Sequence, residues 1–119
     1  MSNARFHSIK FSNNGTRILV STDLNYSLLL NADTCKLENT LGGYQNPMRL
    51  KFDGCFSPDG KYVFVGSQDG SIGIWQSING MNVCRLEGHV DSPLLVEHNP
   101  RFQMFASSDS SLAFWIPPF

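Results

Sequence analysis

The sequence predicts an all-β protein built from a repeated antiparallel unit, and three observations support this fold class. A Phe-Ser motif that ends in a glycine turn occurs at residues 11–15 and again 45 residues later, at 56–60. The same interval of 45 residues separates residues 43–44 (Gly-Tyr) from residues 88–89 (Gly-His). Short runs rich in β-branched and aromatic residues alternate with turn sequences along the chain, and no segment shows helical periodicity.

The middle of the chain shows the strands and turns of this unit most clearly. Residues 58–60 (Pro-Asp-Gly) predict a tight turn, because proline presets φ and glycine accepts a positive φ. The run 62–67 is rich in strand-forming residues, and Asp-Gly at 69–70 predicts a two-residue hairpin. Residues 71–75 alternate small or polar with apolar side chains, as a half-buried strand does, and 82–86 form the next strand. The unit is therefore an up-and-down meander.

A period of 40–45 residues with Gly-His and a downstream tryptophan is the signature of WD repeats, whose units are the four-stranded blades of a β-propeller. Trp75 and Trp115 lie 40 residues apart and fit this pattern. We therefore expect a propeller segment of three antiparallel blades, in units of about 6–41, 48–87 and 93–116. Residues 1–5 are interpreted as an N-terminal tail left by cloning. Because Pro117 and Pro118 cannot serve an interior strand, the third blade is expected to lack its outer strand.

The composition suits a globular protein in water, with 41% hydrophobic and 16% charged residues. A net charge of -1 gives no electrostatic reason to expect nucleic acid or an anionic membrane as partner. No apolar run approaches the roughly 18 residues of a membrane span. Cys35, Cys55 and Cys84 are odd in number and lack metal-ligand spacing, so reduced thiols of the cytosol or nucleus are expected. Glu97 and His98 point to opposite faces of a strand, so we expect no metal and no cofactor.

His89, Ser107 and Asp109 are the residue types of a serine hydrolase triad, so a hydrolase is one hypothesis. The structural alternative is a buried hydrogen-bonded chain of WD repeats. It contains a His before the blade, a Ser on the second strand, an Asp in the next turn and a Trp on the third strand. Trp115 supplies the fourth member, six residues after Asp109. We favour the structural tetrad and expect no catalytic residue, because nothing resembles a nucleophile elbow or provides an oxyanion hole.

The second unit keeps the spacing of this tetrad but has a tyrosine where histidine is expected. Its predicted members are Tyr44, Ser67, Asp69 and Trp75. The first unit retains Thr22 at the serine position, whereas Leu24 and Leu30 replace the aspartate and the tryptophan. The predicted network therefore weakens toward the N-terminus.

Three stretches carry a more specific similarity: Gly-Gly-Tyr at 42–44, the run 56–75, and the ending 99–117 with Ala-Phe-Trp-Ile-Pro. Together they resemble the C-terminal part of the WD-repeat-82 family, over nearly the whole chain from about residue 9 to residue 117. That family includes the propeller subunit of the COMPASS histone methyltransferase complex. It is also found with a nuclear phosphatase complex and with the RNA cleavage–polyadenylation machinery.

The resemblance implies a non-catalytic adaptor whose partners are proteins or peptides of chromatin-modifying and RNA 3′-end processing complexes. It also implies a nuclear location; the residues alone would equally fit the cytoplasm. Members of the family are complete propellers, so this chain resembles less than half of one.

In an antiparallel meander, the loops entering each blade share one rim with the turns between the second and third strands. Propellers commonly bind peptides on that rim, and we expect Tyr44, Gln68 and Asp91 to contact a partner there. The alternative hypothesis is a truncated or half propeller without binding activity of its own, whose two unpaired strand edges drive homo-oligomerisation.

Overall fold

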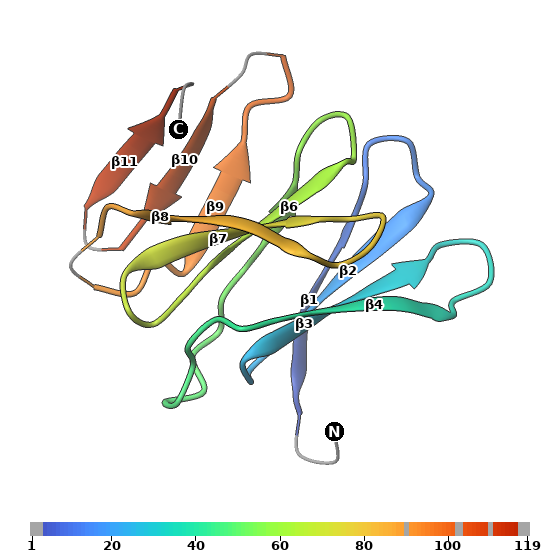
Figure 1. Cartoon of the computed structure of the whole chain (residues 1–119), viewed down its shortest axis with the longest axis horizontal. Coiled ribbons are helices and arrows are strands. Elements are labelled where there is room, and N and C mark those ends of the chain that lie inside the picture. The colour runs from blue at the N-terminus through green and yellow to red at the C-terminus, as the bar shows by residue number, and fades with distance from the viewer. Residues whose placement is uncertain (1–3, 90, 102–103, 110, 117–119) are drawn as a thin grey trace.

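The computed structural model describes residues 4–89, 91–101, 104–109 and 111–116, and over these residues it contains three antiparallel β-sheets and no helix. Figure 1 shows the three sheets side by side in chain order, with the two termini at opposite ends of the molecule. The predicted all-β class and the three blades are confirmed. We call the sheets blade 1, blade 2 and blade 3 in chain order.

Blade 1 consists of β1 (Phe6–Phe11), β2 (Arg17–Thr22), β3 (Tyr26–Asn31) and β4 (Leu37–Gly42). Blade 2 consists of β5 (Cys55–Phe56), β6 (Tyr62–Gly66), β7 (Ser71–Gln76) and β8 (Asn82–Glu87). Blade 3 consists of β9 (Leu95–His98), β10 (Phe105–Ser108) and β11 (Leu112–Trp115). In each blade the strands pair in chain order, and within the described residues β11 has no neighbour on its outer side. Residues 1–3 of the predicted tail and residues 117–119 lie outside the described part.

The first strands of the three blades meet at the centre of the segment. Asp53, just before β5, forms an isolated parallel bridge with Leu95 at the start of β9. Lys10 Nζ on β1 lies 3.0 Å from Glu97 Oε1 on β9, although the two residues are 87 positions apart in the chain. Contacts near the first strands therefore hold the blades together at the centre of the segment. These contacts add to the packing of one sheet face on the next.

One glycine fixes the approach of two loops on the same rim. Gly70 in the β6–β7 hairpin has a φ of 91°, which strains any residue with a Cβ. A Cβ at this position would lie 2.2 Å from the carbonyl oxygen of His89, in the loop that leads into blade 3. His89 N also donates to Gly70 O at 3.2 Å. The predicted Asp-Gly hairpin thus positions His89 as well as reversing the chain.

Blades 1 and 2 pack through one face of each sheet. We call the face that points to the following blade the forward face, and the opposite one the rear face. The forward face of blade 1 contributes Leu19, Leu29 and Leu41, all at most 1% exposed. The rear face of blade 2 meets them with Val63 and Val65, which have no exposed surface, and with Trp75 from the same cluster.

Blades 2 and 3 repeat this arrangement. The forward face of blade 2 buries Phe64, Ile72 and Ile74 against the rear face of blade 3. Phe105 on β10 receives the Phe64 ring at a centroid distance of 4.7 Å and stacks on Trp115 at 5.7 Å with an interplanar angle of 9°. The core therefore consists of two layers of apolar side chains, one in each gap between blades.

Burial in these layers predicts which substitutions destabilise the protein. Leu29→Ala removes a side chain with no exposed surface from the layer between blades 1 and 2, and we expect the free energy of unfolding to fall by about 3 kcal/mol. Ile78→Ala changes a residue that is 76% exposed and should leave this free energy within about 0.5 kcal/mol of the parent value. Urea denaturation followed by circular dichroism measures both. Equal effects of the two substitutions would contradict this layer as the core.

Candidate functional site

Four side chains around blade 3 form one continuous hydrogen-bonded chain. His89 lies in the loop before β9, Ser107 on β10, Asp109 in the following turn and Trp115 on β11. His89 Nδ1 is 3.1 Å from Asp109 Oδ1, and His89 Nε2 is 2.6 Å from Ser107 Oγ. Trp115 Nε1 donates to the same Ser107 Oγ at 2.9 Å. The structure therefore brings together all four residues that the sequence singles out in the third unit.

The donor and acceptor roles in this hydrogen-bonded network follow from the groups at its two ends, the Asp109 carboxylate and the Trp115 indole. A carboxylate can only accept and an indole N–H can only donate, so His89 Nδ1–H donates to Asp109 and Ser107 Oγ accepts from Trp115. The contact between His89 Nε2 and Ser107 Oγ joins these two bonds into one network. The side chains of His89 and Asp109 are 1% and 4% exposed, yet each has a hydrogen-bond partner. A buried polar network stabilises a fold only when its members are satisfied in this way.

Asp109 also ties the β10–β11 turn to the loop before blade 3. The Ser111 amide donates to Asp109 Oδ1 at 2.6 Å, and the Asp91 amide donates to Asp109 Oδ2 at 3.0 Å. The Ser111 amide is the largest cause that holds the Asp109 pKa below its ordinary value, and the Asp91 amide and His89 lower it further. The carboxylate therefore stays ionised and links three segments of the rim.

The same geometry argues against a hydrolytic role for these residues. A serine nucleophile needs an Oγ open to substrate, whereas Ser107 is 1% exposed. The Trp115 indole also donates to Ser107 Oγ and occupies a lone pair that a nucleophile needs free. The arrangement can fix a turn and a loop, but it presents no accessible oxygen for attack.

The predicted tetrad of the second unit is wrong in its first member. The Tyr44 hydroxyl lies 3.0 Å from Ser27 Oγ on β3, in the preceding blade, and makes no hydrogen bond to Ser67. Its ring packs edge-on against Trp75, with centroids 5.7 Å apart, and burial raises the Tyr44 pKa to about 12. A phenol carries its hydroxyl farther from the backbone than an imidazole carries its nitrogens. Tyr44 therefore reaches across the blade interface instead of into its own hairpin.

The other predicted members in blade 2 form no continuous network, although the Ser67 side chain is a hydrogen-bond partner of Asp69. Ser67 Oγ accepts from a backbone amide of the loop before blade 2, at 2.8 Å. Asp69 Oδ1 accepts from the amide and the hydroxyl of Ser71, at 3.0 and 2.6 Å, and so closes its own hairpin. Trp75 Nε1 donates to the carbonyl oxygen of Gly42, at 3.1 Å. Blade 2 thus stabilises the same rim through separate local contacts.

A second polar cluster, which sequence reasoning missed, organises the loop between blades 1 and 2. Asn46 is 5% exposed, and its Nδ2 donates to three carbonyl oxygens, those of Asp23, Leu24 and Leu50. Its Oδ1 accepts from the Leu50 amide at 2.7 Å. One side chain therefore holds the loop against the β2–β3 turn of blade 1.

An ion pair completes this cluster. Arg49 Nε and Nη2 both lie 3.1 Å from the Asp23 carboxylate, on Oδ2 and Oδ1, and the Arg5 amide donates to Oδ1 at 2.9 Å. The Arg49 side chain lowers the Asp23 pKa most, followed by the Arg5 amide. Arg49 adopts a φ of 55°, which is uncommon outside glycine. The one sequence signal for this cluster is the length of the loop before blade 2. That loop spans residues 43–54, whereas the loop before blade 3 spans only residues 88–94.

Of the three residues predicted to contact a partner, the structure leaves one inaccessible. Tyr44 is only 5% exposed, so its prediction as a contact residue is wrong: its ring fills the gap between blades 1 and 2. Asp91 is exposed, and Gln68 is half-buried. Gln68 Oε1 accepts from the Met48 amide at 3.0 Å, which places the 72% exposed Met48 side chain beside it on the rim.

No candidate metal site occurs in the part of the chain that the structure describes. His7 Nδ1 and Asp53 Oδ1 approach to 3.8 Å near the centre of the segment. Neither this pair nor any other cluster of described residues gathers the three His, Cys, Asp or Glu side chains that a metal ion needs. Among the described residues no helix is long and apolar enough to cross a membrane.

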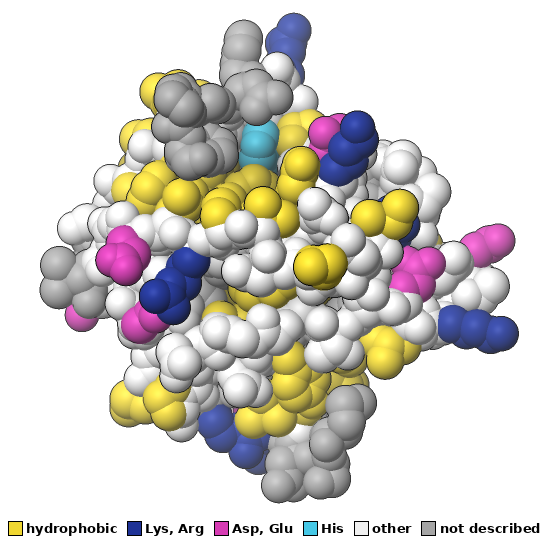
Figure 2. All heavy atoms as spheres, viewed as in Figure 1, with side chains coloured by type: hydrophobic (Ala, Val, Ile, Leu, Met, Phe, Trp, Pro, Cys, Tyr) yellow, Lys and Arg dark blue, Asp and Glu magenta, His cyan; other side chains and the backbone are white. Residues whose placement is uncertain are grey.

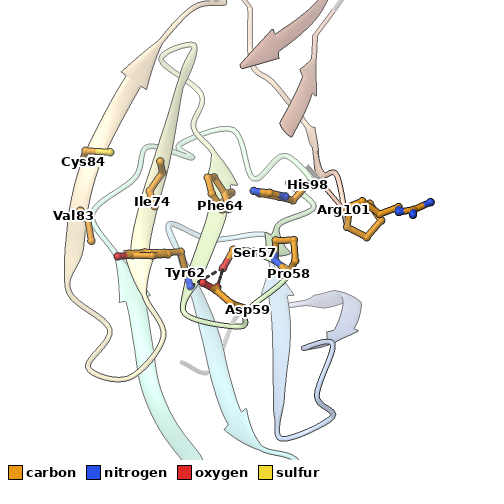
Figure 3. A pocket seen from close by; sticks show the side chains of 11 residues that line it. Ser57, Pro58, Asp59, Tyr62, Phe64, Ile74, Val83, Cys84, His98 and Arg101 are labelled. Carbon is orange, nitrogen blue, oxygen red and sulfur yellow. Dashed lines mark hydrogen bonds between the residues drawn. The ribbon is translucent and has the colours of Figure 1, made fainter. Parts of the chain in front are cut away.

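A cleft of about 390 Å³ lies between blades 2 and 3. Figure 3 shows Phe64, Ile74 and Cys84 on its inner side and Arg101 at its edge, directed away from it. At the corresponding place between blades 1 and 2, Asn39 Nδ2 donates to the Ser77 carbonyl oxygen in the turn after β7. The counterpart of Ser77 after β11 is residue 117, outside the described part. The cleft lies at the blade interface, and its lining combines apolar side chains such as Phe64 and Ile74 with the polar side chains of Ser57, Asp59 and His98.

Removal of the central hydroxyl of the blade 3 network should destabilise the protein. Ser107→Ala leaves the Trp115 N–H and His89 Nε2 without their partner, and we expect the free energy of unfolding to fall by about 2 kcal/mol. Ser111→Ala, which changes an exposed side chain and keeps the amide that binds Asp109, is the matched control. Thermal melting and urea titration report the difference. Loss of the same free energy in both variants would contradict the network.

The ionised state of Asp109 predicts an acid-sensitive step. Because folding holds its pKa below the ordinary value of 3.8, its stabilisation is complete above that pH and disappears as the pH falls through the lower value in the folded protein. Asp109→Asn should lower the melting temperature at pH 7 and flatten its decline between about pH 5 and 2. Asp33→Asn, at an exposed position outside the network, serves as the control. An unchanged pH profile in Asp109→Asn would refute this assignment.

Comparisons with known proteins agree with this architecture. The family described as "WD domain, G-beta repeat" matches residues 35–76. WD repeat-containing protein 82 of Drosophila melanogaster is 36% identical over 110 residues, which cover 92% of this chain and 35% of the relative. COMPASS component SWD2 of Saccharomyces cerevisiae is 30% identical over 125 residues, which cover 95% of this chain and 38% of that protein. This chain therefore spans little more than a third of the relatives it matches.

Among solved structures, the WD40 repeats of RRP9 superpose with a TM-score of 0.84 at 14% sequence identity, over 97% of this chain and 36% of that one. At this identity the likeness concerns the fold alone. Together with the repeat spacing and the three stacked sheets, the comparisons identify this chain as a WD40-repeat protein, similar over most of its length to WD repeat-containing protein 82 and to COMPASS component SWD2.

Proposed function

We propose that this protein is a non-catalytic scaffold that acts as a subunit of a nuclear complex, of the chromatin-modifying or RNA 3′-end processing kind. The observation that carries the proposal is the use of the polar side chains on the rim. The side chains of His89, Ser107 and Asp109 hydrogen-bond to one another and to the backbone, so they hold loops in place and leave no reactive group open. The similarity to a COMPASS component supports membership of a multi-subunit complex.

The contact surface in this proposal is the rim that carries the loops before blades 2 and 3. Its candidates are the exposed residues Met48 and Asp91 and the half-buried Gln68. Methionine is enriched at protein interfaces, and an exposed carboxylate on the rim supplies selectivity for a partner. Met48 and Gln68 are adjacent through the Met48 amide, and Ser92 Oγ donates to the Gln68 carbonyl oxygen at 3.2 Å. The three candidates therefore lie on one connected surface.

The rigidity of this rim supports binding rather than catalysis. Asn46 and the Asp23–Arg49 pair fix the loop before blade 2, and Asp109 fixes the loop before blade 3. A surface whose backbone is already ordered loses less conformational entropy when a partner binds. The rim is thus preorganised to present side chains to another protein.

The proposed surface predicts selective loss of partners. In a nuclear extract, a tagged chain carrying Met48→Asp or Asp91→Lys should recover at least about tenfold less of its partner proteins than the parent chain. Ile78→Asp changes a residue of similar exposure in the β7–β8 turn, on the opposite rim, and is the matched control. Quantitative mass spectrometry of the purified material gives the ratios. Full recovery of all partners by both rim variants would refute this surface.

The remaining hydrolase hypothesis has a direct chemical test. A fluorophosphonate probe, which labels activated serines, should leave Ser107 of the folded protein unmodified because its Oγ is buried and hydrogen-bonded on both sides. Peptide mass spectrometry after incubation locates any label. Stoichiometric labelling of Ser107 that is abolished by His89→Ala would overturn the non-catalytic assignment.

A further inference from the structure

A pocket of about 240 Å³ lies between blades 1 and 2, at the tetrad position of the second unit. Three of the predicted tetrad members, Tyr44, Ser67 and Trp75, are among its lining residues. The described residues include all four strands of both blades, so complete sheets bound the pocket on both sides. Its shape therefore depends only on how these two blades meet.

In blade 3, two rings fill the space at this position. The His89 side chain is 1% exposed, and its Nε2 lies 2.6 Å from Ser107 Oγ. The Trp115 ring packs against Gly88 so closely that a Cβ at that residue would collide with it. An imidazole and an indole thus close the tetrad of blade 3.

The tryptophan of blade 2 is turned the other way. The Trp75 ring packs against Gly73, and its Nε1 donates to the Gly42 carbonyl oxygen at 3.1 Å rather than to a serine. A Cβ built on Gly43, which corresponds to Gly88, would meet no atom within 4 Å. The space that an indole fills in blade 3 therefore stays open in blade 2.

Gly73 is the residue that allows this orientation. A Cβ at Gly73 would collide with the Trp75 ring. The counterpart of Gly73 in blade 3, 40 residues later, is Ala113, whose Cβ excludes the same orientation for Trp115. The pocket thus follows from a glycine in place of an alanine, together with Tyr44 in place of the tetrad histidine.

The pocket has a polar floor and an open mouth. On the floor, the hydroxyl groups of Ser67 and Ser71 are buried beside Trp75. Ser67 Oγ accepts from a backbone amide at 2.8 Å, and its second lone pair can accept from a donor in the pocket. The lining residues at the mouth are exposed: Gly43, Asn82 and Arg85. A flat ring that carries an N–H therefore fits both the shape and the polarity of the pocket.

The charges at the mouth balance each other. Arg85 Nη1 lies 3.4 Å from Asp69 Oδ2. On the face of the molecule that Figure 2 shows, acidic and basic side chains are likewise interspersed rather than separated by sign. A neutral ligand meets no excess of charge at the mouth, whereas an anion would have to compete with Asp69 for Arg85.

We propose that this pocket binds an imidazole ring, presented by a histidine of a partner protein. The ring lies beside Trp75 and donates its N–H to Ser67 Oγ, so it takes the place that His89 occupies in the tetrad of blade 3. The proposal rests on the scaffold function only for the source of the ring. A titration with imidazole itself needs no partner, so its failure is distinguishable from failure of the proposed function.

Nuclear magnetic resonance of the isotope-labelled chain tests the site with imidazole as the probe. The chain has two tryptophans, so the spectrum contains two indole N–H signals, which Trp115→Phe assigns. At about pH 8, where free imidazole is mostly neutral, the Trp75 signal should shift with half-saturation at about 10 mM, an affinity typical of so small a ligand. The Trp115 signal should not move. Absence of any Trp75 shift up to about 100 mM would overturn the proposal.

Two variants alter the pocket from opposite sides. Gly73→Ala supplies the Cβ found in blade 3, which should turn Trp75 toward Gly43 and abolish imidazole binding. Ser67→Ala removes the acceptor and should weaken binding about fivefold. Met81→Ala, at a 64% exposed position in the β7–β8 turn, is the control and should bind like the parent chain. Thermal melting establishes that each variant is folded. Parent-like binding in every folded pocket variant would refute the assignment.

Three further probes identify the group that binds. The blocked amino acid N-acetylhistidine methylamide should shift the Trp75 signal as imidazole does, and its alanine analogue should not. Because 1-methylimidazole lacks the N–H, it should bind more weakly than imidazole. Acetate tests the alternative of an anion held by Arg85. Binding of acetate in preference to imidazole would contradict the proposal.

Discussion

The structure depends on the burial of one sheet face against the next. A single blade presents apolar side chains on both faces, so it cannot bury them alone and requires a neighbour on each side. Leu29 on the forward face of blade 1 and Val63 on the rear face of blade 2 illustrate the result, since neither has any exposed surface. Turns, polar networks and rim loops act on this frame by fixing the relative position of blades that are already packed.

The two loops that connect consecutive blades are both held in place by polar side chains, but by different residue types in each loop. Before blade 3, a histidine joins a serine on β10 and an aspartate in the next turn, and Trp115 closes the chain. Before blade 2, Tyr44 reaches back to blade 1, and Asn46 satisfies the backbone of a longer loop. In both arrangements the polar side chains named here are paired with one another or with the backbone, which is the condition for a stable buried network. The tetrad is therefore one of several ways to hold the rim, and its residues need not recur in every blade.

Sequence reasoning identified the site of blade 3 because that site is built from residues at fixed repeat positions. It failed at Tyr44 because the repeat position gives the location of a side chain but not the direction in which a longer one extends. It also missed the pairing of Asp23 with Arg49, which lie 26 residues apart and belong to no repeat motif. The left-handed backbone at Arg49 has no compositional signal, since glycine does not occupy that position.

The sequence by itself determined the all-β class, the order of strands and turns, the repeat interval and the composition of the blade 3 network. These features depend on local alternation, turn chemistry and spacing, all of which are present in a linear chain. Only the tertiary structure decided which polar atoms meet across blades and that Tyr44 is buried. Those outcomes depend on contacts between segments distant in sequence, and on side-chain length measured across an interface that forms only when the blades stack.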